Sequence, residues 1–515
     1  FLRFAQWKIE QAGRGVVGMI TNHGYLDNPT FRGMRQSLLR TFDAIYVLDL
    51  HGNALKRERT PAGEPDENVF DIRPGVAVVF LVKRSAERKQ AAHVHHAGLW
   101  GAREAKYAWL EAHDVSDTAW RELQPQAPFH LFAPQDVTLT ASYNAFVSVP
   151  DLFAVNSVGI VTARDSLTIH WSPDEVWRTV TVFSRMEPEL ARQGFDLGPD
   201  ARDWKVTLAQ KDLLDSGPDR EKVVPVLYRP FDVRHTYYTS RSRGFICMPR
   251  PEVMRHMLAG ENVALMMPKR VEHVGAWQHA FVTQQISDHV AVSLKTIDYH
   301  FPLYLYPDTD RRDLFSHLQP VGRRPNLNPQ VVAALTAAHG QAPTPEQVFN
   351  YVYAVLYAPA YRAKYAQFLR LDFPRIPFTA DRALFAALAG LGGRLVALHL
   401  LDSAELDSPA ARFEGAGDSR VAKSKGLRYD AAAARVYINA AQYFAPVPAA
   451  VWGYQVGGYQ VCHKWLKDRQ ERQLSLDEIR TYCRIVSALG RTLALQGEID
   501  ALYGAVEDSV LGLSR

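Results

Sequence analysis

GVVGMITNHGYLDNPTFRGMRQSLLRTFDAIYVLDLHGN, residues 15–53, decides the predicted fold of the N-terminal part of this 515-residue chain. The apolar run 15–20 stops at a polar loop, which predicts a buried strand. Asp27-Asn28-Pro29 then supplies a cap and a first-turn proline for a helix. Residues 44–50 form a second apolar run, and residues 75–82 form a third beyond a loop. Strands that alternate with a helix predict an α/β arrangement with parallel strands.

Composition restricts the class of protein. Hydrophobic residues make up 47% of the chain and charged residues 22%, which predicts a globular protein of several domains. The net charge of +4 is compatible with a polyanionic partner without requiring one. Cys247, Cys462 and Cys483 form no paired motif, and neither a signal peptide nor a membrane-spanning apolar run is present, so we expect a cytoplasmic protein that binds no membrane. The chain starts without methionine at helical apolar spacing, so we expect a fragment.

Breaks in the pattern suggest domain boundaries. Residues 1–90 carry the strands described above, and the mixed residues 91–150 are predicted to be a connector. Short β-like runs alternate with helices over residues 151–320, which predicts an α+β unit. A linker rich in proline, asparagine and arginine then precedes a helical segment, residues 321–410. Residues 411–515 are predicted to be a C-terminal helical part. Within the last two segments, Thr344-Pro345-Glu346 and Ser475 with Asp477-Glu478 predict two helix starts.

The segment 15–53 resembles the end of an adenine-N6 DNA methyltransferase domain of the large restriction-modification type. The resemblance rests on Ile20-Thr21-Asn22, Gly24-Tyr25-Leu26 and the run from Ile45 to Asn53, and it continues through residues 68–77 to about Arg84. Neither a glycine-rich F-x-G-x-G loop nor a [DNS]-P-P-[YFW] tetrapeptide occurs in the chain. The resemblance therefore implies a Rossmann-like remnant that would not methylate DNA by itself, with no catalytic residue in this chain.

The same resemblance implies candidate residues for a base-flipping pocket. Methylation of an exocyclic amine requires a base that is extruded from the duplex and stacked on an aromatic ring. Phe70 could supply such a ring, or it could be an ordinary core residue. Asn22, His23 and Tyr25 lie at the carboxyl end of a strand, where open α/β sheets place ligands. The implied cofactor is S-adenosylmethionine in the intact enzyme, bound outside this chain.

A second group of tracts is similar to the specificity region of single-chain, Type ISP-like restriction-modification enzymes. These tracts are residues 157–167, 227–234, 300–306, 356–378 and 451–469. In that family an upstream methyltransferase half, and in some members a nuclease and an ATP-driven motor, belong to the same polypeptide. The resemblance therefore implies that double-stranded DNA and those domains are the partners of this chain.

Arginine and tyrosine alternate over residues 228–270, which favours contact with DNA. Guanidinium groups bind phosphates or guanine edges, and tyrosines can bond phosphates. The loop-like segment 238–244 could enter a groove, although a charged run is more often a solvated face. The DNA-binding candidates are Arg164, Arg229, Arg234, Tyr237, Tyr238, Arg241, Arg243, Lys269 and Arg270.

Motifs for a metal site, a nucleotide-binding loop or a nuclease are weak or absent in the sequence. His93, His95 and His96 lack a neighbouring carboxylate or cysteine at ligand spacing, so we expect surface residues and no metal. No G-x-x-x-x-G-K-[ST] loop and no convincing nuclease triad occurs. An unrelated metabolic enzyme would need a phosphate loop or an acid-base pair, and neither is evident.

These observations predict an α/β methyltransferase remnant followed by an α+β DNA target-recognition region with helical C-terminal segments. The expected function is sequence-specific DNA recognition within an adenine-N6 methyltransferase of a restriction-modification system. The alternative is a stand-alone specificity subunit without catalysis.

Overall fold

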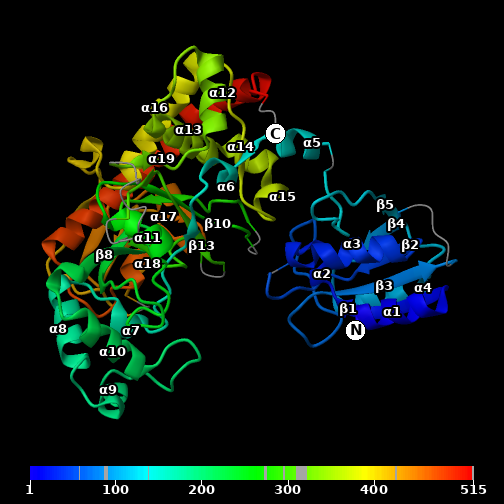
Figure 1. The fold of residues 1–515 in the computed structure, drawn as a ribbon, viewed down its shortest axis with the longest axis horizontal. Helices are drawn as coiled ribbons and strands as arrows, with labels where there is room; N and C mark the ends of the chain where they lie inside the picture. The colour runs from blue at the N-terminus through cyan, green and yellow to red at the C-terminus, as the bar shows by residue number, and fades with distance from the viewer. Residues whose placement is uncertain are drawn as a thin grey trace, which may run out of the picture. The chain divides into compact units, whose positions relative to one another are not determined.

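The computed structural model describes the chain except residues 57, 86–90, 137, 272–274, 294–295, 309–321, 424–425 and 513–515. Two compact units divide it (Figure 1): unit 1 comprises residues 1–140, and unit 2 comprises residues 141–271 and 276–515, with the described residue Gly275 grouped with unit 1. The predicted boundaries at residues 90 and 320–321 lie outside the described residues.

Unit 1 is a mixed five-stranded sheet with helices. Its strands lie in the order β1-β3-β2-β4-β5. The strands are β1 (Gly15–Asn22), β2 (Ala44–Asp49), β3 (Val76–Lys83), β4 (His93–Gly98) and β5 (Arg121–Leu123). The helices are α1 (Leu2–Ala12), α2 (Gly24–Asp27), the 3-10 turn η1 (Pro29–Phe31), α3 (Arg32–Thr41) and α4 (Arg103–Ala112).

The predicted strands and helices of residues 1–83 are present, but two predictions are wrong. Strand β1 is not buried, since its residues alternate between partly buried and exposed, and β3 is not parallel to its neighbours. That strand lies between β1 and β2 and is antiparallel to both. The reason lies in the connections. Helix α3 links β1 to β2, whereas β2 leads to β3 through a loop without a helix, and parallel neighbours need a crossover connection.

The segment predicted to be a connector belongs partly to this sheet. β4 pairs in parallel with β2, and β5 pairs with β4. His96 is buried on β4 rather than at the surface, because alternate residues of β4 point into the core. The sheet therefore continues well beyond residue 90.

The first half of unit 2 contains two sheets whose strands are intermixed in chain order. One has the order β11-β10-β13-β7 and the other β12-β8-β9. The strands are β7 (Ser157–Val158), β8 (Val223–Arg229), β9 (Asp232–Tyr237), β10 (Ala264–Pro268), β11 (Phe281–Thr283), β12 (Ile286–Ser287) and β13 (Asp298–Pro302). Two-residue pairs are β6 (Val147–Ser148) with β16 (Arg375–Ile376), β14 (Tyr304–Leu305) with β15 (Arg324–Pro325), and β21 (Gln455–Val456) with β22 (Tyr459–Gln460).

Helices occur throughout unit 2. Up to residue 258 they are α5 (Thr140–Ala145), α6 (Val149–Leu152), α7 (Asp165–Thr168), α8 (Pro173–Phe183), α9 (Pro188–Gly194), α10 (Val206–Ser216) and α11 (Pro251–Leu258). From residue 329 onward they are α12 (Pro329–His339), α13 (Pro345–Tyr357), α14 (Pro359–Lys364), α15 (Ala366–Leu369), α16 (Arg382–His399), α17 (Ala449–Trp452), α18 (Val461–Lys467) and α19 (Leu476–Asp508). Helices α8, α9 and α10 lie at one end of the unit, and α12, α13 and α16 lie at the other (Figure 1). The short 3-10 turns η2 (Arg220–Lys222) and η4 (Ala404–Leu406) complete the described helices.

Two predicted helix starts are confirmed at atomic detail. Thr344 opens α13 and Ser475 opens α19, each through a capping box that satisfies orphan backbone N–H groups. The helical prediction for residues 411–515 is incomplete, since a four-stranded sheet, β17-β20-β19-β18, precedes α17. Its strands, Arg412–Glu414, Arg428–Asp430, Arg435–Tyr437 and Tyr443–Ala445, are three residues each, too short to show alternation in the sequence.

Helix α16 is long and apolar enough to cross a membrane by length and composition. It packs against α13 and α19, as a core helix does. Gly392 makes this packing possible, because a Cβ there would lie 1.9 Å from the backbone oxygen of Asn350.

Candidate nucleic-acid interface

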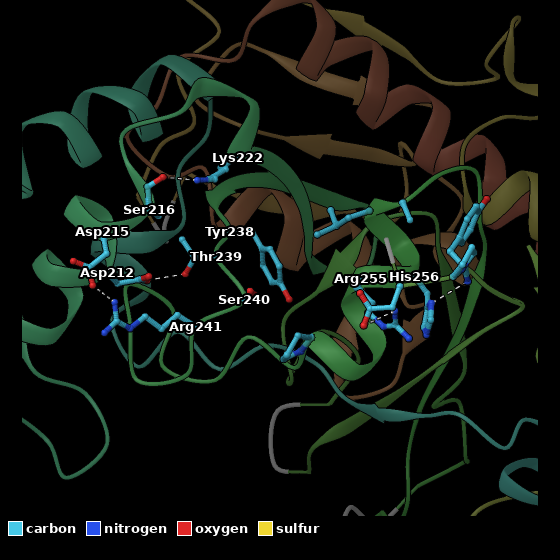
Figure 2. Close-up of a pocket in the computed structure, with 16 residues that line it drawn as sticks. Asp212, Asp215, Ser216, Lys222, Tyr238, Thr239, Ser240, Arg241, Arg255 and His256 are labelled. Atoms are coloured by element: carbon cyan, nitrogen blue, oxygen red, sulfur yellow. Dashed lines mark hydrogen bonds and ion pairs between the residues drawn. The ribbon is translucent and has the colours of Figure 1, made fainter. Parts of the chain in front are cut away.

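The loop between β9 and α11 presents two arginines of the predicted DNA-binding segment. Buried Asp212 of α10 holds this loop: its Oδ2 accepts hydrogen bonds from Thr239 Oγ1 at 2.7 Å and from the Phe245 backbone N–H at 2.8 Å. Figure 2 shows Asp212 and Thr239 joined in this way beside Arg241. The prediction that residues 238–244 form a loop is confirmed. Its hydrogen bonds to the Asp212 carboxylate hold the loop in this conformation.

Glycine is required at position 244 of this loop. A Cβ there would lie 2.2 Å from Asp212 Oδ2, closer than any real Cβ contact. The preceding residue, Arg243, has φ of +59°, a left-handed conformation that costs free energy for residues other than glycine. The strain is offset by the Arg243 N–H, which donates to the Cys247 carbonyl at 2.8 Å.

Arg241 and Arg243 are exposed and paired with carboxylates. Arg241 bonds Asp215, which also binds Lys211 Nζ at 2.9 Å. Arg243 lies 3.2 Å from Asp203. Exposed ion pairs contribute only about 0–1 kcal/mol to stability, so both guanidinium groups can exchange a carboxylate for a phosphate at little cost.

A cavity of about 560 Å³ lies beside the loop. Tyr238, Ser240 and Arg241 line one side, and Arg255 and His256 of α11 line the other (Figure 2). Burial, and then the charges of Arg255 and Arg324, lower the pKa of His256 to about 4, so its ring is neutral at physiological pH.

Arg229 and Arg234, two other predicted candidates, are packed inside the unit. Arg229 bonds buried Asp288 at 2.6 Å and lies 3.8 Å from the Tyr228 ring centre. Arg234 is 2.9 Å from buried Asp232. These contacts assign both side chains a packing role, and their predicted contact with DNA stays a prediction.

The two tyrosines of the prediction are core residues. Tyr237 is fully buried, and its hydroxyl donates to the Gly217 carbonyl at 2.9 Å. Tyr238 is 8% exposed and donates to the Pro249 carbonyl at 3.0 Å. Both side chains belong to the hydrophobic core of unit 2, a feature that a run of polar aromatic residues does not reveal. Neither hydroxyl faces solvent here.

The remaining candidates lie elsewhere on unit 2. Arg164 donates to the Leu197 and Pro199 carbonyls at 2.8 Å and lies 5.0 Å from the Trp204 ring centre. Lys269 follows β10, is half exposed, and lies 3.8 Å from Asp372. Arg270 beside it is partly exposed. The structure therefore does not bring all nine candidates onto one loop. Arg241 and Arg243 are the two exposed candidates that share the loop after β9.

In unit 1 the candidates for the base-flipping pocket divide into exposed and buried residues. Phe70 is 43% exposed, so it is not the core residue of the alternative interpretation. Asn22 is exposed, and its Oδ1 accepts from the Gly24 N–H at 2.7 Å. Tyr25 and His23 are buried. A Cβ on Gly75 would strike the His23 ring at 2.4 Å, so the loop that carries Phe70 runs directly over His23.

His23 belongs to a network of charged groups at the strand ends. Its Nδ1 lies 2.9 Å from Asp49 Oδ1, and its Nε2 lies 3.0 Å from Asn53 Nδ2. Burial acts to lower the pKa of His23, but the hydrogen bond and charge of Asp49 outweigh it, so the pKa is raised. Asp49 and His51 were not among the predicted site residues, although the spacing Asp49-x-His51 is visible in the sequence.

Sequence reasoning also missed Trp171. Its ring lies between three guanidinium groups, with Arg234 and Arg472 each at 3.8 Å and Arg469 at 4.6 Å. The arginines come from distant parts of the chain, so no local pattern could reveal this contact.

Comparison with protein families identifies unit 2. The model of the Type ISP C-terminal specificity domain matches residues 151–496, well over half of the chain. The chain belongs to this family. Among curated proteins no match was found.

Three solved structures resemble this chain over nearly all of its length. "cryoEM structure DrdV-DNA complex" is 25% identical with a TM-score of 0.69, over 98% of this chain and 51% of that one. "ATP-dependent Type ISP restriction-modification enzyme LlaBIII bound to DNA" is 19% identical with a TM-score of 0.70, over 97% and 33%. A nuclease-deletion mutant of the Type ISP enzyme LlaGI, in complex with a DNA substrate mimic, is 19% identical with a TM-score of 0.65, over 96% and 40%. The chain thus spans about half or less of the length of each.

Proposed function

We propose that this chain recognises a specific sequence in double-stranded DNA as the specificity part of a restriction-modification enzyme. The family match over residues 151–496 carries the proposal. The similar structures named above are DNA complexes, and the DrdV complex resembles this chain at 25% identity.

The loop that Asp212 holds is the proposed contact surface. Arg241 and Arg243 exchange Asp215 and Asp203 for DNA phosphates or guanine edges, which guanidinium forks bind bidentately. Because Asp212 fixes the loop before binding, little ordering entropy is lost on contact. Gly244 permits the close approach that makes this arrangement possible.

The experiment is selection of duplexes from a random pool, followed by binding measurements on the selected and a scrambled duplex at several salt concentrations. We expect tighter, salt-sensitive binding to the selected duplex. Replacement of Arg241 and Arg243 together by alanine is expected to weaken binding and to reduce the salt slope by about 1 for each lost phosphate contact. The control is replacement of exposed Arg382 and Arg480 by alanine, which removes the same two positive charges at positions outside the loop. No salt-sensitive binding by the wild-type chain contradicts the proposal.

We further propose that unit 1 is the end of an adenine-N6 methyltransferase domain. The support is an open sheet: β1 has no second neighbour among the described strands, and it exposes Val16 and Ile20 by 63% and 58%. An unpaired apolar edge strand is a liability in an isolated domain and is normally covered. The same exposed edge argues against the stand-alone specificity subunit, because the sheet of such a subunit would be complete without a further strand.

S-adenosylmethionine is the cofactor of the proposed intact enzyme and would supply the methyl group. The residues present do not fit it, because the chain has no glycine-rich loop of the F-x-G-x-G kind. Transfer of a labelled methyl group to the selected duplex is expected only when an upstream methyltransferase half is joined to this chain, and transfer by this chain alone contradicts that assignment.

A reducing cytoplasm is the proposed location. Cys247, Cys462 and Cys483 are free and buried, which fits a protein that forms no disulfides.

A further inference from the structure

A second cavity adjoins the one beside the loop 238–244. It also has a volume of about 560 Å³, and Arg324 and Glu252 are among the residues that line it. Figure 2 shows Arg255 and His256 across the first cavity from Arg241. Together the two cavities form a hollowed surface from Arg241 across α11 to Arg324, here called the α11 groove. The residues that line both cavities are Arg255, His256, Tyr306, Pro307 and Asp308.

Two arginines reach this groove from separate elements. In α11, Met254 and Met257 are buried in the core of unit 2, whereas the Arg255 side chain is 41% exposed. Arg324 is exposed and lies on β15, which pairs with β14 so that Arg324 is opposite Leu305. Because Leu305 also lines the second cavity, this strand pair places Arg324 at the rim of the groove.

Tyr306 and His256, which line both cavities, are held by hydrogen bonds. The Tyr306 backbone N–H donates to His256 Nδ1 at 3.0 Å, and the Tyr306 hydroxyl donates to the Glu261 carbonyl at 2.6 Å. Burial lowers the pKa of His256 most, and the charges of Arg255 and Arg324 lower it further, so both guanidinium groups lie near this ring. The groove therefore brings two positive charges together, and the neutral ring of His256 adds none.

The carboxylates of the second cavity leave both arginines available to an anion. Asp308 Oδ2 lies 3.5 Å from Arg255 Nη1 in an exposed pair, and such pairs contribute only about 0–1 kcal/mol to stability. Glu252 Oε1 accepts a hydrogen bond from the Ser157 hydroxyl at 2.6 Å. Arg324 forms no ion pair with the residues that the structure describes. A phosphate can therefore replace Asp308 at Arg255, and another can bind Arg324, without leaving a buried charge unpaired.

We propose that the α11 groove holds DNA backbone next to the bases that the loop 238–244 contacts, and that Arg255 and Arg324 bind its phosphates. The inference rests on the proposed DNA recognition and adds a second role to the same surface. Guanidinium groups bind phosphate oxygens bidentately, and phosphate contacts orient a protein on the duplex without reading its sequence. The groove favours DNA backbone over an acidic protein segment because it is continuous with the loop that contacts the DNA.

The experiment measures binding of the full chain to the selected and the scrambled duplex at several salt concentrations, for the wild type and for Arg255→Gln/Arg324→Gln. We expect the double variant to bind both duplexes roughly tenfold more weakly with an unchanged ratio between them, because phosphate contacts are independent of sequence. The salt slope is expected to fall by about 1 for each lost phosphate contact. A neutral methylphosphonate, placed at each backbone position in turn, is expected to weaken binding by the wild type at the contacted phosphates and to have no effect there on the variant.

The matched control is Arg382→Gln/Arg480→Gln. Arg382 is exposed without an ion pair among the described residues, and Arg480 forms an exposed pair with Asp477 at 3.6 Å. This control is expected to bind DNA as the wild type does. If the groove variant fails to fold by circular dichroism, Arg324→Gln alone decides.

The outcomes separate this inference from the proposed function. No salt-sensitive binding by the wild type contradicts the proposed function itself. If the wild type binds and the folded groove variant matches the control, Arg255 and Arg324 do not contact DNA and the inference is overturned. Loss of affinity for the selected duplex alone would assign the two arginines to base reading and would also overturn it.

Discussion

Asp232 at the start of β9 and Arg469, which follows α18, form a buried ion pair 2.9 Å long although 237 residues separate them in the chain. The second Asp232 oxygen binds Arg234 at 2.9 Å, and Arg469 also binds Glu478 at 3.0 Å. The pair therefore joins the first sheets of unit 2 to its C-terminal helices.

Replacement of Arg469 by alanine is expected to destabilise unit 2 by about 1–3 kcal/mol, because buried Asp232 Oδ1 loses its partner while Oδ2 keeps Arg234. Urea denaturation measures the loss. Arg480→Ala removes an exposed arginine that pairs with exposed Asp477, and it should cost less than about 1 kcal/mol. Equal losses of stability in the two variants would show that the buried ion pair contributes no more than the exposed one.

Replacement of Gly244 by alanine is expected to shift the loop off Asp212 and to weaken DNA binding roughly tenfold, about 1.4 kcal/mol. Binding to the selected duplex measures the effect. Gly390→Ala is the control: that glycine lies in α16 with open space around it, so alanine is expected to keep affinity and to raise stability by up to about 1 kcal/mol. Full affinity in Gly244→Ala would exclude the loop from the contact surface.

Replacement of Asp215 by asparagine is expected to strengthen DNA binding, since Arg241 is then released from its carboxylate partner. An exposed pair is worth about 0.2–1 kcal/mol, which predicts a gain between about 1.4-fold and about 5-fold. Asp418→Asn makes the same change in net charge at a carboxylate that pairs with Arg420. The same gain in both variants would assign the effect to net charge rather than to Arg241.

Acid pH is expected to destabilise unit 2 through histidines that are buried in the neutral form. Burial lowers the pKa of His300 to about 3, and burial together with the charge of Arg362 lowers that of His399 to about 3. In the unfolded chain these rings take up protons near pH 6.5. The stability that the neutral rings provide above pH 6.5 is therefore lost as the pH falls from about 6.5 toward about 3.

Urea denaturation at pH 7.5, 6.5 and 5.5 measures this dependence on the wild type and on His399→Gln. Each neutral-held histidine contributes a slope of up to about 1.4 kcal/mol per pH unit, so the variant should have a slope smaller by about that amount. His113→Gln, at an exposed position, should leave the slope unchanged. An unchanged slope in His399→Gln would contradict the assignment.

The sequence by itself determined the local elements and the family of unit 2. Continuous apolar runs predicted the strands β1, β2 and β3, because strands within a sheet carry apolar side chains over short, uninterrupted stretches. Capping residues predicted the starts of α13 and α19, because orphan N–H groups at a helix start require a nearby acceptor. The resemblance to the Type ISP specificity region is confirmed by the family match.

Tertiary structure alone decided which of the arginines and tyrosines are available to a partner. Arg229, Arg234, Tyr237 and Arg241 look equivalent in the sequence, yet the first two are held by buried carboxylates and Tyr237 by a backbone carbonyl, whereas Arg241 is exposed. The same holds for the charged network at the end of β2. The sequence placed Asp49 two residues from His51, but only the fold of the following loop set Glu58 at 3.5 Å from the same ring, because that distance depends on backbone turns and not on spacing.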